Sequence, residues 1–326
     1  MPGIYRPILR PRRGEFAALH HLDEATARLV LPIIEVRGER LGPLIKALPP
    51  ATGKLAVDLP ESADPLDLAD ELADLGVSMV PVLRAFHSNP RLVQNGLAAR
   101  MHLKRAVLRL QPHVDAGNPA AATAATERML IGSGLEHECV DLVIDLAETA
   151  CVVHADEVQE QARHVLRWAR GRPWRSVSVA AGAMPANLDD LPTDEAVTVG
   201  RLDARLWARL AAPGVGYADY GVTSPVRRLG VQFHRQLPTL RYTADDEWWI
   251  YRWARRGGRS DGRCRDLCRT LVGSTQWPAA GARFSWGDAE IARRARSAGG
   301  AGSPAGWIGW STSHHIAHVL QTPAAA

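Results

Sequence analysis

The chain has 326 residues, 46% of them apolar and 23% charged, which is ordinary for a soluble globular protein with one barrel-sized core and an appendage. No apolar run approaches the ~20 residues that span a bilayer, the N-terminal apolar stretch is too short for a signal peptide, and four cysteines are too few for a secreted disulfide framework. We therefore expect a cytoplasmic protein with no membrane partner. Its formal charge of +4 arises in the C-terminal part, where twelve Arg stand against seven Asp or Glu from residue 241 onward.

Eight short apolar runs follow one another between residues 1 and 222, and each ends in a charged or Gly-rich stretch. Amphipathic helical patterns separate them, at 15–28, 65–75 and 156–170 among others, and this spacing produces parallel strands with right-handed crossovers. An open doubly wound sheet fits less well because no GxGxxG turn follows an early strand. The sequence therefore predicts a TIM-like (β/α)8 barrel in residues 1–222. Its strands are expected at Tyr5–Arg10, Leu31–Val36, Leu55–Leu59, Met79–Arg84, Arg105–Gln111, Asp141–Leu146, Ser176–Gly182 and Gly216–Val222.

After Val222 the alternation of apolar runs and helical patterns ends. Thr239–Trp253 contains two aromatic, β-prone runs around Ala-Asp-Asp and predicts a hairpin. We expect residues 223–326 to form an α+β appendage, rich in Trp and Arg, that packs on the barrel mouth. Trp interleaved with Arg, including the RRGGR run at 255–259, could stack on bases and hold phosphates, although such Trp more often fill a small core. Short helices are expected at Cys264–Val272, Gly287–Arg296 and Ser311–Leu320.

Charged side chains stand at the C-terminal ends of the predicted strands, where barrel enzymes keep their chemistry. Carboxylates supply a general base or hard oxygen ligands for a divalent metal, and Arg holds phosphate or carboxylate groups through two parallel hydrogen bonds. In the other interpretation these charges pair with one another and close the barrel top. The candidate catalytic residues are Glu35, Asp58, Asp145 and Asp219, and the candidate anion-binding residues are Arg84 and Arg109.

Two further segments at strand ends could bind substrate. Arg10 and Glu15 flank the end of the first predicted strand, where Gly14 begins a helix, and clustered Arg at a helix start binds anions well. Glu15 is equally what helix-dipole capping alone would favour. Tyr220 lies between glycines in the GYADYGV segment and could stack on a ring or donate a proton, but a tight turn explains those glycines equally well.

A zinc site is a further possibility in the appendage. Cys264 and Cys268 lie four residues apart on one predicted helix, as do His314 and His318 on another. The four side chains would form a Cys2His2 site if the helices faced each other. Neither spacing is a zinc-finger signature, and HExxH, Walker A, GxSxG and CxxC motifs are all absent.

Several motifs in series resemble the "beta protein" family of tailed phages and bacterial gene clusters, from about Tyr5 to His318. The first motif departs from the family pattern, because Arg10 and Arg12 stand where a Lys is expected, which argues against a Lys-based mechanism there. The resemblance implies a phage-related or antiviral defence setting and a protein partner encoded nearby. It adds Arg241, Tyr242 and Asp288 as positions that match the family, together with Glu15. The motifs are Tyr5-x-Pro7-Ile8-Leu9-Arg10, Gly14-Glu15, Pro32-Ile33-Ile34-Glu35, Tyr217–Gly221, Leu240-Arg241-Tyr242-Thr243 and Phe284-Ser285-x-Gly287-Asp288.

Two functional hypotheses follow from these patterns. In the first, the barrel is an enzyme, a hydrolase or lyase, that acts on a phosphate-bearing substrate such as a nucleotide or nucleic acid, with a divalent metal as a possible cofactor. Arg241 would then help to hold the anion and Tyr242 would position it. In the second, the barrel is not catalytic, and the appendage binds nucleic acid or a partner protein in a phage or defence assembly.

Overall fold

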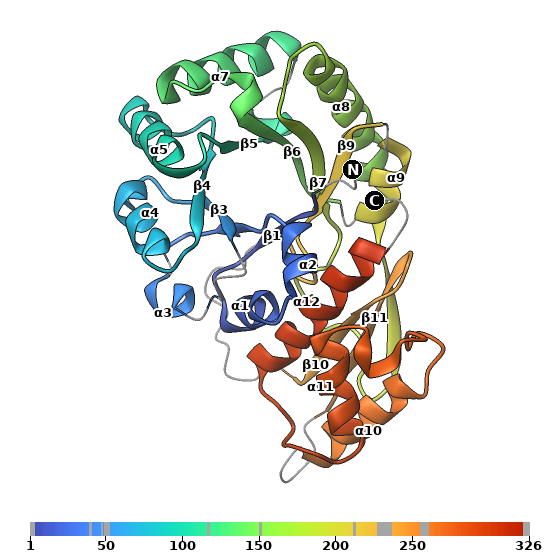
Figure 1. Cartoon of the computed structure of the whole chain (residues 1–326). Helices are drawn as coiled ribbons and strands as arrows, with labels where there is room; N and C mark the ends of the chain where they lie inside the picture. Colours follow the sequence, from blue (N-terminus) through green and yellow to red (C-terminus); the bar gives the residue numbers. More distant parts are fainter. Residues whose placement is uncertain are drawn as a thin grey trace.

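The computed structural model contains a closed barrel of eight parallel strands, which confirms the predicted fold class (Figure 1). It describes residues 4–38, 41–46, 48, 53–115, 118–149, 152–210, 213–226, 237–254 and 261–321. Each predicted strand corresponds to one barrel strand, and the last of them pairs back to the first, Arg6 opposite Ala218. The strands are β1 (Arg6–Leu9), β2 (Ile33–Glu35), β3 (Lys54–Asp58), β4 (Ser78–Leu83), β5 (Ala106–Leu110), β6 (Val140–Glu148), β7 (Ser176–Gly182) and β9 (Val215–Asp219).

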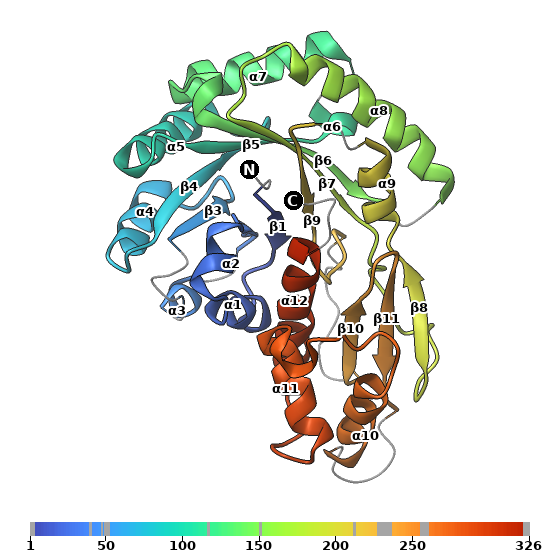
Figure 2. The ribbon, with the colours of Figure 1, turned by 45° about the vertical axis from the view of Figure 1, so that its right-hand side comes forward.

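Helices connect the barrel strands and surround them (Figures 1 and 2). The stretch 15–28, predicted as a single helix, is two, because the Asp23 side chain accepts a hydrogen bond from the Thr26 N–H and so starts a second helix. The helices are α1 (Arg13–His20), α2 (Glu24–Arg28), α3 (Gly42–Ile45), α4 (Pro65–Ala73), α5 (Asn89–His102), α6 (Pro112–Asp115), α7 (Pro119–Ser133), α8 (Val152–Arg170) and α9 (Leu202–Leu210), with a 3-10 turn at His137–Cys139.

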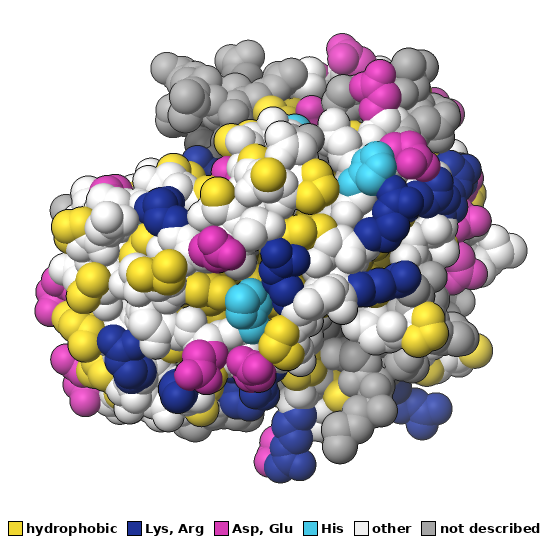
Figure 3. All heavy atoms as spheres, turned by 90° about the horizontal axis from the view of Figure 1, so that it is seen from above, with side chains coloured by type: hydrophobic (Ala, Val, Ile, Leu, Met, Phe, Trp, Pro, Cys, Tyr) yellow, Lys and Arg dark blue, Asp and Glu magenta, His cyan; other side chains and the backbone are white. Residues whose placement is uncertain are grey.

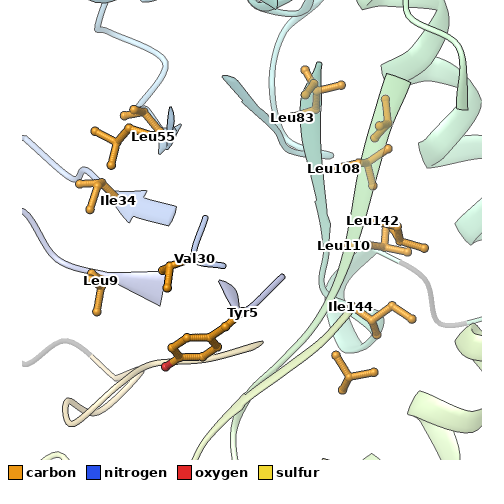
Figure 4. Packing of buried hydrophobic residues seen from close by; sticks show 14 of the residues in the cluster. Tyr5, Leu9, Val30, Ile34, Leu55, Leu83, Leu108, Leu110, Leu142 and Ile144 are labelled. Carbon is orange, nitrogen blue, oxygen red and sulfur yellow. The ribbon is translucent and has the colours of Figure 1, made fainter. Parts of the chain in front are cut away.

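Alternate residues of each strand face either the helices or the barrel interior. The outward residues, among them Leu9, Ile34 and Leu108, form the largest apolar core, between the strands and the helices (Figure 4). The inward residues, among them Ile33 and Val107, form a second cluster inside the barrel. Because both faces of each strand are buried, the strands read as continuous apolar runs in the sequence.

The N-terminal end of the barrel is closed by an internal ion pair. Arg6 of β1 donates to the Asp141 carboxylate (3.0 Å), and Arg105 donates to its other oxygen (2.6 Å). Both guanidiniums and the carboxylate are buried. A buried pair of this kind is stable only when its geometry is good, which these distances satisfy.

A second sheet of three antiparallel strands lies outside the barrel, in the order β10–β11–β8. The predicted hairpin is confirmed, with Arg241 opposite Ile250. The third strand was not predicted: it is short, mostly part-exposed and lacks an apolar run, and it follows β7 in the sequence. We call this sheet and its helices the C-terminal unit: β8 (Ala196–Gly200), β10 (Thr239–Thr243), β11 (Glu247–Arg252), α10 (Asp261–Val272), a 3-10 turn at Gly281–Arg283, α11 (Trp286–Ala295) and α12 (Pro304–Gln321).

Helix α12 joins the C-terminal unit to the barrel, running beside α1 (Figure 2). The contact is close because a Cβ on Gly14 would lie 2.5 Å from the Ala305 carbonyl oxygen, so only glycine fits there. On the opposite side of α12, the Trp310 ring packs in a small core of its own with Trp307 and Ile291.

On the face seen in Figure 3, acidic and basic side chains are interspersed with apolar ones, and no field of a single sign covers it. None of the helices in the described part of the chain is both long and apolar enough to cross a membrane.

Candidate active site

Strand alternation brings charged side chains together inside the C-terminal end of the barrel. Val107 and Val143 belong to the interior cluster, so the residues two positions later, Arg109 and Asp145, point to the same side one layer higher. This layer, which we call the mouth layer, is buried. Its members are Glu35, Asp58, Arg84, Arg109, Asp145 and Tyr220, all of them predicted site residues.

Arg109 is the centre of the mouth layer. Its Nη1 donates to Glu35 (3.0 Å) and Asp58 (2.7 Å), its Nε donates to Asp145 (2.8 Å), and its Nη2 donates to the Tyr220 hydroxyl (2.8 Å). Burial opposes the charge on this guanidinium, but the surrounding acidic groups raise its pKa well above the ordinary value. Every nitrogen of the guanidinium thus has a partner from the barrel itself, so Arg109 holds the carboxylates in place.

Tyr220 and Gln111 both donate hydrogen bonds to Asp145 in the mouth layer. The Tyr220 hydroxyl donates to Asp145 (2.8 Å), and burial raises the pKa of Tyr220 well above its ordinary value, so the phenol stays protonated at neutral pH. Gln111 donates to Asp145 (3.1 Å) and accepts from Arg84 Nη2 (2.9 Å). Gln111 was not predicted as a site residue, although its position two residues after Arg109, just past the end of β5, was available as a signal.

Arg84 is the guanidinium of the mouth layer with an unused donor. Its Nη1 donates to Asp58 (2.9 Å), whereas its Nε is buried with no hydrogen-bond partner in the described part of the chain. Phe86, which is 63% exposed, lies with its ring centroid 5.2 Å from the guanidinium carbon. The β4 end therefore offers a buried donor beneath an exposed aromatic ring.

His87 lies behind this strand end, and sequence reasoning missed it. Its Nδ1 accepts from the Arg84 backbone N–H (3.3 Å), which leaves the proton on Nε2, and Nε2 is buried without a partner among the described residues. Burial lowers the pKa of His87 to about 4, so the ring is neutral at pH 7. A single His after the aromatic Phe86 gave no pattern from which to predict this role.

The structure places Asp219 away from the mouth layer. It neighbours Ala218 and Tyr220, which face inward, so its side chain points outward, where it accepts from Tyr5 (2.6 Å) and contacts His315 of α12 (2.7 Å). Burial alone would raise its pKa, but His315 and these hydrogen bonds lower the pKa of Asp219 to about 2. Asp219 thus connects the barrel to α12.

Tyr242 and Asp288 lie together inside the C-terminal unit. The Tyr242 hydroxyl donates to Asp288 (2.6 Å), and the His314 ring stacks on Tyr242 with centroids 3.7 Å apart and contacts the same carboxylate (3.0 Å). Burial and Asp288 raise the pKa of Tyr242 far above its ordinary value. This family-matched pair is therefore a second buried cluster, and the structure does not bring it into the mouth layer.

Glu15, Arg10 and Arg241 form a third group. Arg10, at the end of β1, donates to the Ser224 carbonyl (2.6 Å). Glu15 is fully buried, and both of its carboxylate oxygens lack a hydrogen-bond partner in the described residues. The guanidiniums of Arg10 and Arg241 are close enough to act on its charge.

No group of three or more His, Cys, Asp or Glu side chains in the described residues is arranged to hold a metal ion. Cys264 donates to the Ala301 carbonyl, and His314 contacts Asp288, so these two candidate zinc ligands are engaged elsewhere. In the mouth layer the carboxylates converge on Arg109 rather than on one another. A divalent metal in the mouth layer would need oxygen ligands in addition to these side chains, for example from a bound phosphate.

The Trp residues of the C-terminal unit mostly fill cores. Trp248, Trp253, Trp307 and Trp310 are all buried, and Trp310 is stacked against the Arg294 guanidinium at 3.8 Å. These rings are therefore not an exposed platform for bases. The Arg run at 255–259 lies outside the described residues.

Comparison with known proteins identifies a family. A family model described as "Beta protein" matches residues 5–321. No curated protein matches the chain. Among solved structures, triosephosphate isomerase from Bartonella henselae is 15% identical with a TM-score of 0.35, over 67% of this chain and 91% of that one. A biosynthetic arginine decarboxylase from Campylobacter jejuni is 8% identical with a TM-score of 0.39, over 97% of this chain and 55% of that one. At such identities the likeness concerns the fold alone.

Proposed function

The chain belongs to the Beta protein family, and we propose that it is an enzyme acting on a phosphate-bearing substrate, a nucleotide or nucleic acid, at the barrel mouth. One observation carries this proposal: the inward side chains at the C-terminal end of the barrel include three carboxylates, two guanidiniums and a tyrosine. The C-terminal end is where barrel enzymes keep their active sites. The phage or defence setting, a cytoplasmic location and a partner protein from a neighbouring gene belong to the same proposal and rest on the resemblance and the sequence.

The proposed roles follow from the contacts. Arg84 receives the phosphate, because its buried Nε has no acceptor in the described chain. Asp145 acts as general base or acid together with Tyr220, whose proton it already accepts. Glu35 and Asp58 complete the negative side of the layer, and Arg109 is a positioning residue that fixes all three carboxylates.

The reaction class that suits this layer is hydrolysis or elimination at a phosphate ester. Carboxylates move protons in such reactions, and a guanidinium neutralises charge on the phosphate oxygens. A general acid or base contributes about 10²–10⁴-fold to the rate. Replacing Asp145 by Asn should therefore lower the turnover rate by at least about 100-fold.

The test combines ligand binding with turnover. Thermal denaturation of the purified protein is measured with nucleotides or with short single- and double-stranded DNA, each with and without Mg²⁺ or Mn²⁺. In a separate assay the folded protein is incubated with the same ligands, and the products are separated by ion-exchange chromatography. A ligand at 100 times its Kd adds about 2.7 kcal/mol of stability, which raises the melting temperature measurably. We expect Arg84→Gln to cancel that rise and Asp145→Asn to abolish product formation while circular dichroism remains unchanged. Full turnover in both variants would refute the proposal.

A second candidate function is a non-catalytic binding module, and one observation favours it. Each guanidinium nitrogen of Arg109 is engaged by the barrel's own side chains, as expected if the mouth charges only satisfy one another. In that case DNA would stabilise the protein without product, and the effect would fall steeply with salt. Mouth variants would then leave binding unchanged.

A further inference from the structure

A small pocket lies in the C-terminal unit and shares no lining residue with the mouth layer. Its volume is about 140 Å³. Two guanidiniums line it, Arg241 on β10 and Arg252 on β11, together with Asn187 and Asp189 from the β7–β8 connection and Trp307 of α12. We call it the Arg241 pocket.

Both guanidiniums have buried donors without acceptors. The Nε of Arg241 and the Nε of Arg252 lack a hydrogen-bond partner in the part of the chain that the structure describes. Arg252 is itself only 4% exposed, and its remaining nitrogens donate to the Leu191 carbonyl (2.6 Å) and to Asp189 (3.2 Å). A buried donor without an acceptor costs about 1–3 kcal/mol, so a ligand oxygen that reached either Nε would recover that cost.

Two guanidiniums and one carboxylate, that of Asp189, line the pocket, so the lining is net positive. Burial lowers the pKa of Arg241 to about 10, and repulsion from Arg12, Arg10 and Arg252 contributes to that shift. Glu15 is the neighbouring carboxylate that opposes it. A bound anion would offset the repulsion among these four guanidiniums.

Glu15 belongs to α1, and its carboxylate accepts no hydrogen bond from Arg241. The carboxyl is fully buried, and burial raises the pKa of Glu15 to about 7 against the attraction of Arg12, Arg10 and Arg241. The part of α12 that packs against the neighbouring Gly14 consists of Ala305, Ile308 and Gly309, which carry no charge. The ionisation of Glu15 therefore depends on the nearby guanidiniums.

We propose that the Arg241 pocket binds a phosphate group and that Glu15 takes up a proton when the anion binds. The pocket is large enough for a phosphate group and two guanidiniums line it, so the proposed ligand class is inorganic phosphate or the terminal group of a phosphate monoester. A bound phosphate cancels the positive field of Arg241 at Glu15, and the buried carboxyl then favours its neutral form. This inference does not depend on the proposed reaction at the mouth.

Isothermal titration calorimetry with inorganic phosphate tests the proposal on the full chain. At pH 7, titrations in HEPES and in Tris separate binding from proton uptake, because the two buffers differ in ionisation heat. We expect the wild type to take up more protons per phosphate than Glu15→Gln does, because the buried Glu15 carboxyl is partly ionised at this pH before the anion binds. Phosphate itself titrates near neutral pH and contributes equally to both proteins, so the difference between them reports Glu15. Glu15→Gln should bind phosphate at least as tightly as the wild type.

Arg241→Lys keeps a positive charge beside Glu15 but removes the Nε donor, and we expect it to weaken phosphate binding by at least tenfold. Arg84→Gln removes only the phosphate contact proposed in the mouth layer, so it should keep the phosphate binding and the proton uptake that depend on Arg241 and Glu15. Binding lost in Arg84→Gln and kept in Arg241→Lys would place the phosphate in the mouth and overturn this inference while supporting the proposed function. An absence of phosphate binding, or unchanged proton uptake in Glu15→Gln, would also overturn it.

Discussion

Replacing Arg109 by Met tests whether the mouth layer depends on one guanidinium. The side chain is 1% exposed and contacts three carboxylates at 2.7–3.0 Å, so its removal leaves buried negative charges without their main partner. Breaking a buried pair by removing one side costs about 3–5 kcal/mol. Arg84 still pairs with Asp58 and Arg37 still pairs with Glu35, so we assign this loss chiefly to Asp145. That amount is a large part of the 5–15 kcal/mol typical of a folded domain.

The matched control is Arg37→Met, because Arg37 contacts the same Glu35 carboxylate (3.0 Å) with a side chain that is 56% exposed. An exposed pair contributes about 0–1 kcal/mol. Urea denaturation, followed by circular dichroism, should show a large loss of unfolding free energy for Arg109→Met and almost none for Arg37→Met. Adding Asp145→Asn to Arg109→Met should restore part of the loss. Similar small losses in both single variants would refute the view that Arg109 organises the layer.

Two further predictions concern stability. The pKa of Asp219 is lowered to about 2 by His315 and its hydrogen bonds, so its stabilisation, about 2–3 kcal/mol, is fully present above the unfolded pKa near 4 and is lost as the pH falls through 2. Urea denaturation should show that the gap between wild type and Asp219→Asn shrinks over this window; a constant gap would contradict the assignment. Gly96→Ala places a Cβ 1.9 Å from the Ser133 carbonyl oxygen and should cost about 1–3 kcal/mol. A Cβ on Gly262 of α10 meets no atom within 4 Å in the described part of the chain, so Gly262→Ala should stabilise the protein by up to about 1 kcal/mol. Equal melting temperatures of the two variants would refute this comparison.

The barrel could be predicted because parallel strands buried on both faces leave continuous apolar runs, as in Met79–Arg84 and Asp141–Leu146. β8 could not, because it is short and mostly part-exposed and takes its partner, β11, from much later in the chain. In the site, the six residues of the mouth layer all fall on the inward face at the C-terminal ends of their strands. Aligning the predicted strands by their alternation reveals this common position in the sequence.

Asp219 shows where that reasoning fails. It stands at a strand end like Asp145, but a shift of one residue turns its side chain to the outer face, toward His315. Interactions between side chains distant in the sequence depend on how the C-terminal unit packs. Examples are the hydrogen bond from Tyr242 to Asp288 and the electrostatic attraction between Arg241 and Glu15. No local pattern encodes that packing.

The pairing of β8 with β11 has a consequence for the order in which the protein is made. On the ribosome β8 emerges directly after β7, while the strand that covers its edge is synthesised only after β9 and β10. Until then both edges of β8 are unpaired and can associate with other chains. A synthesis pause or a truncation before Glu247 should therefore favour aggregation at this strand, even where the preceding barrel strands are already complete.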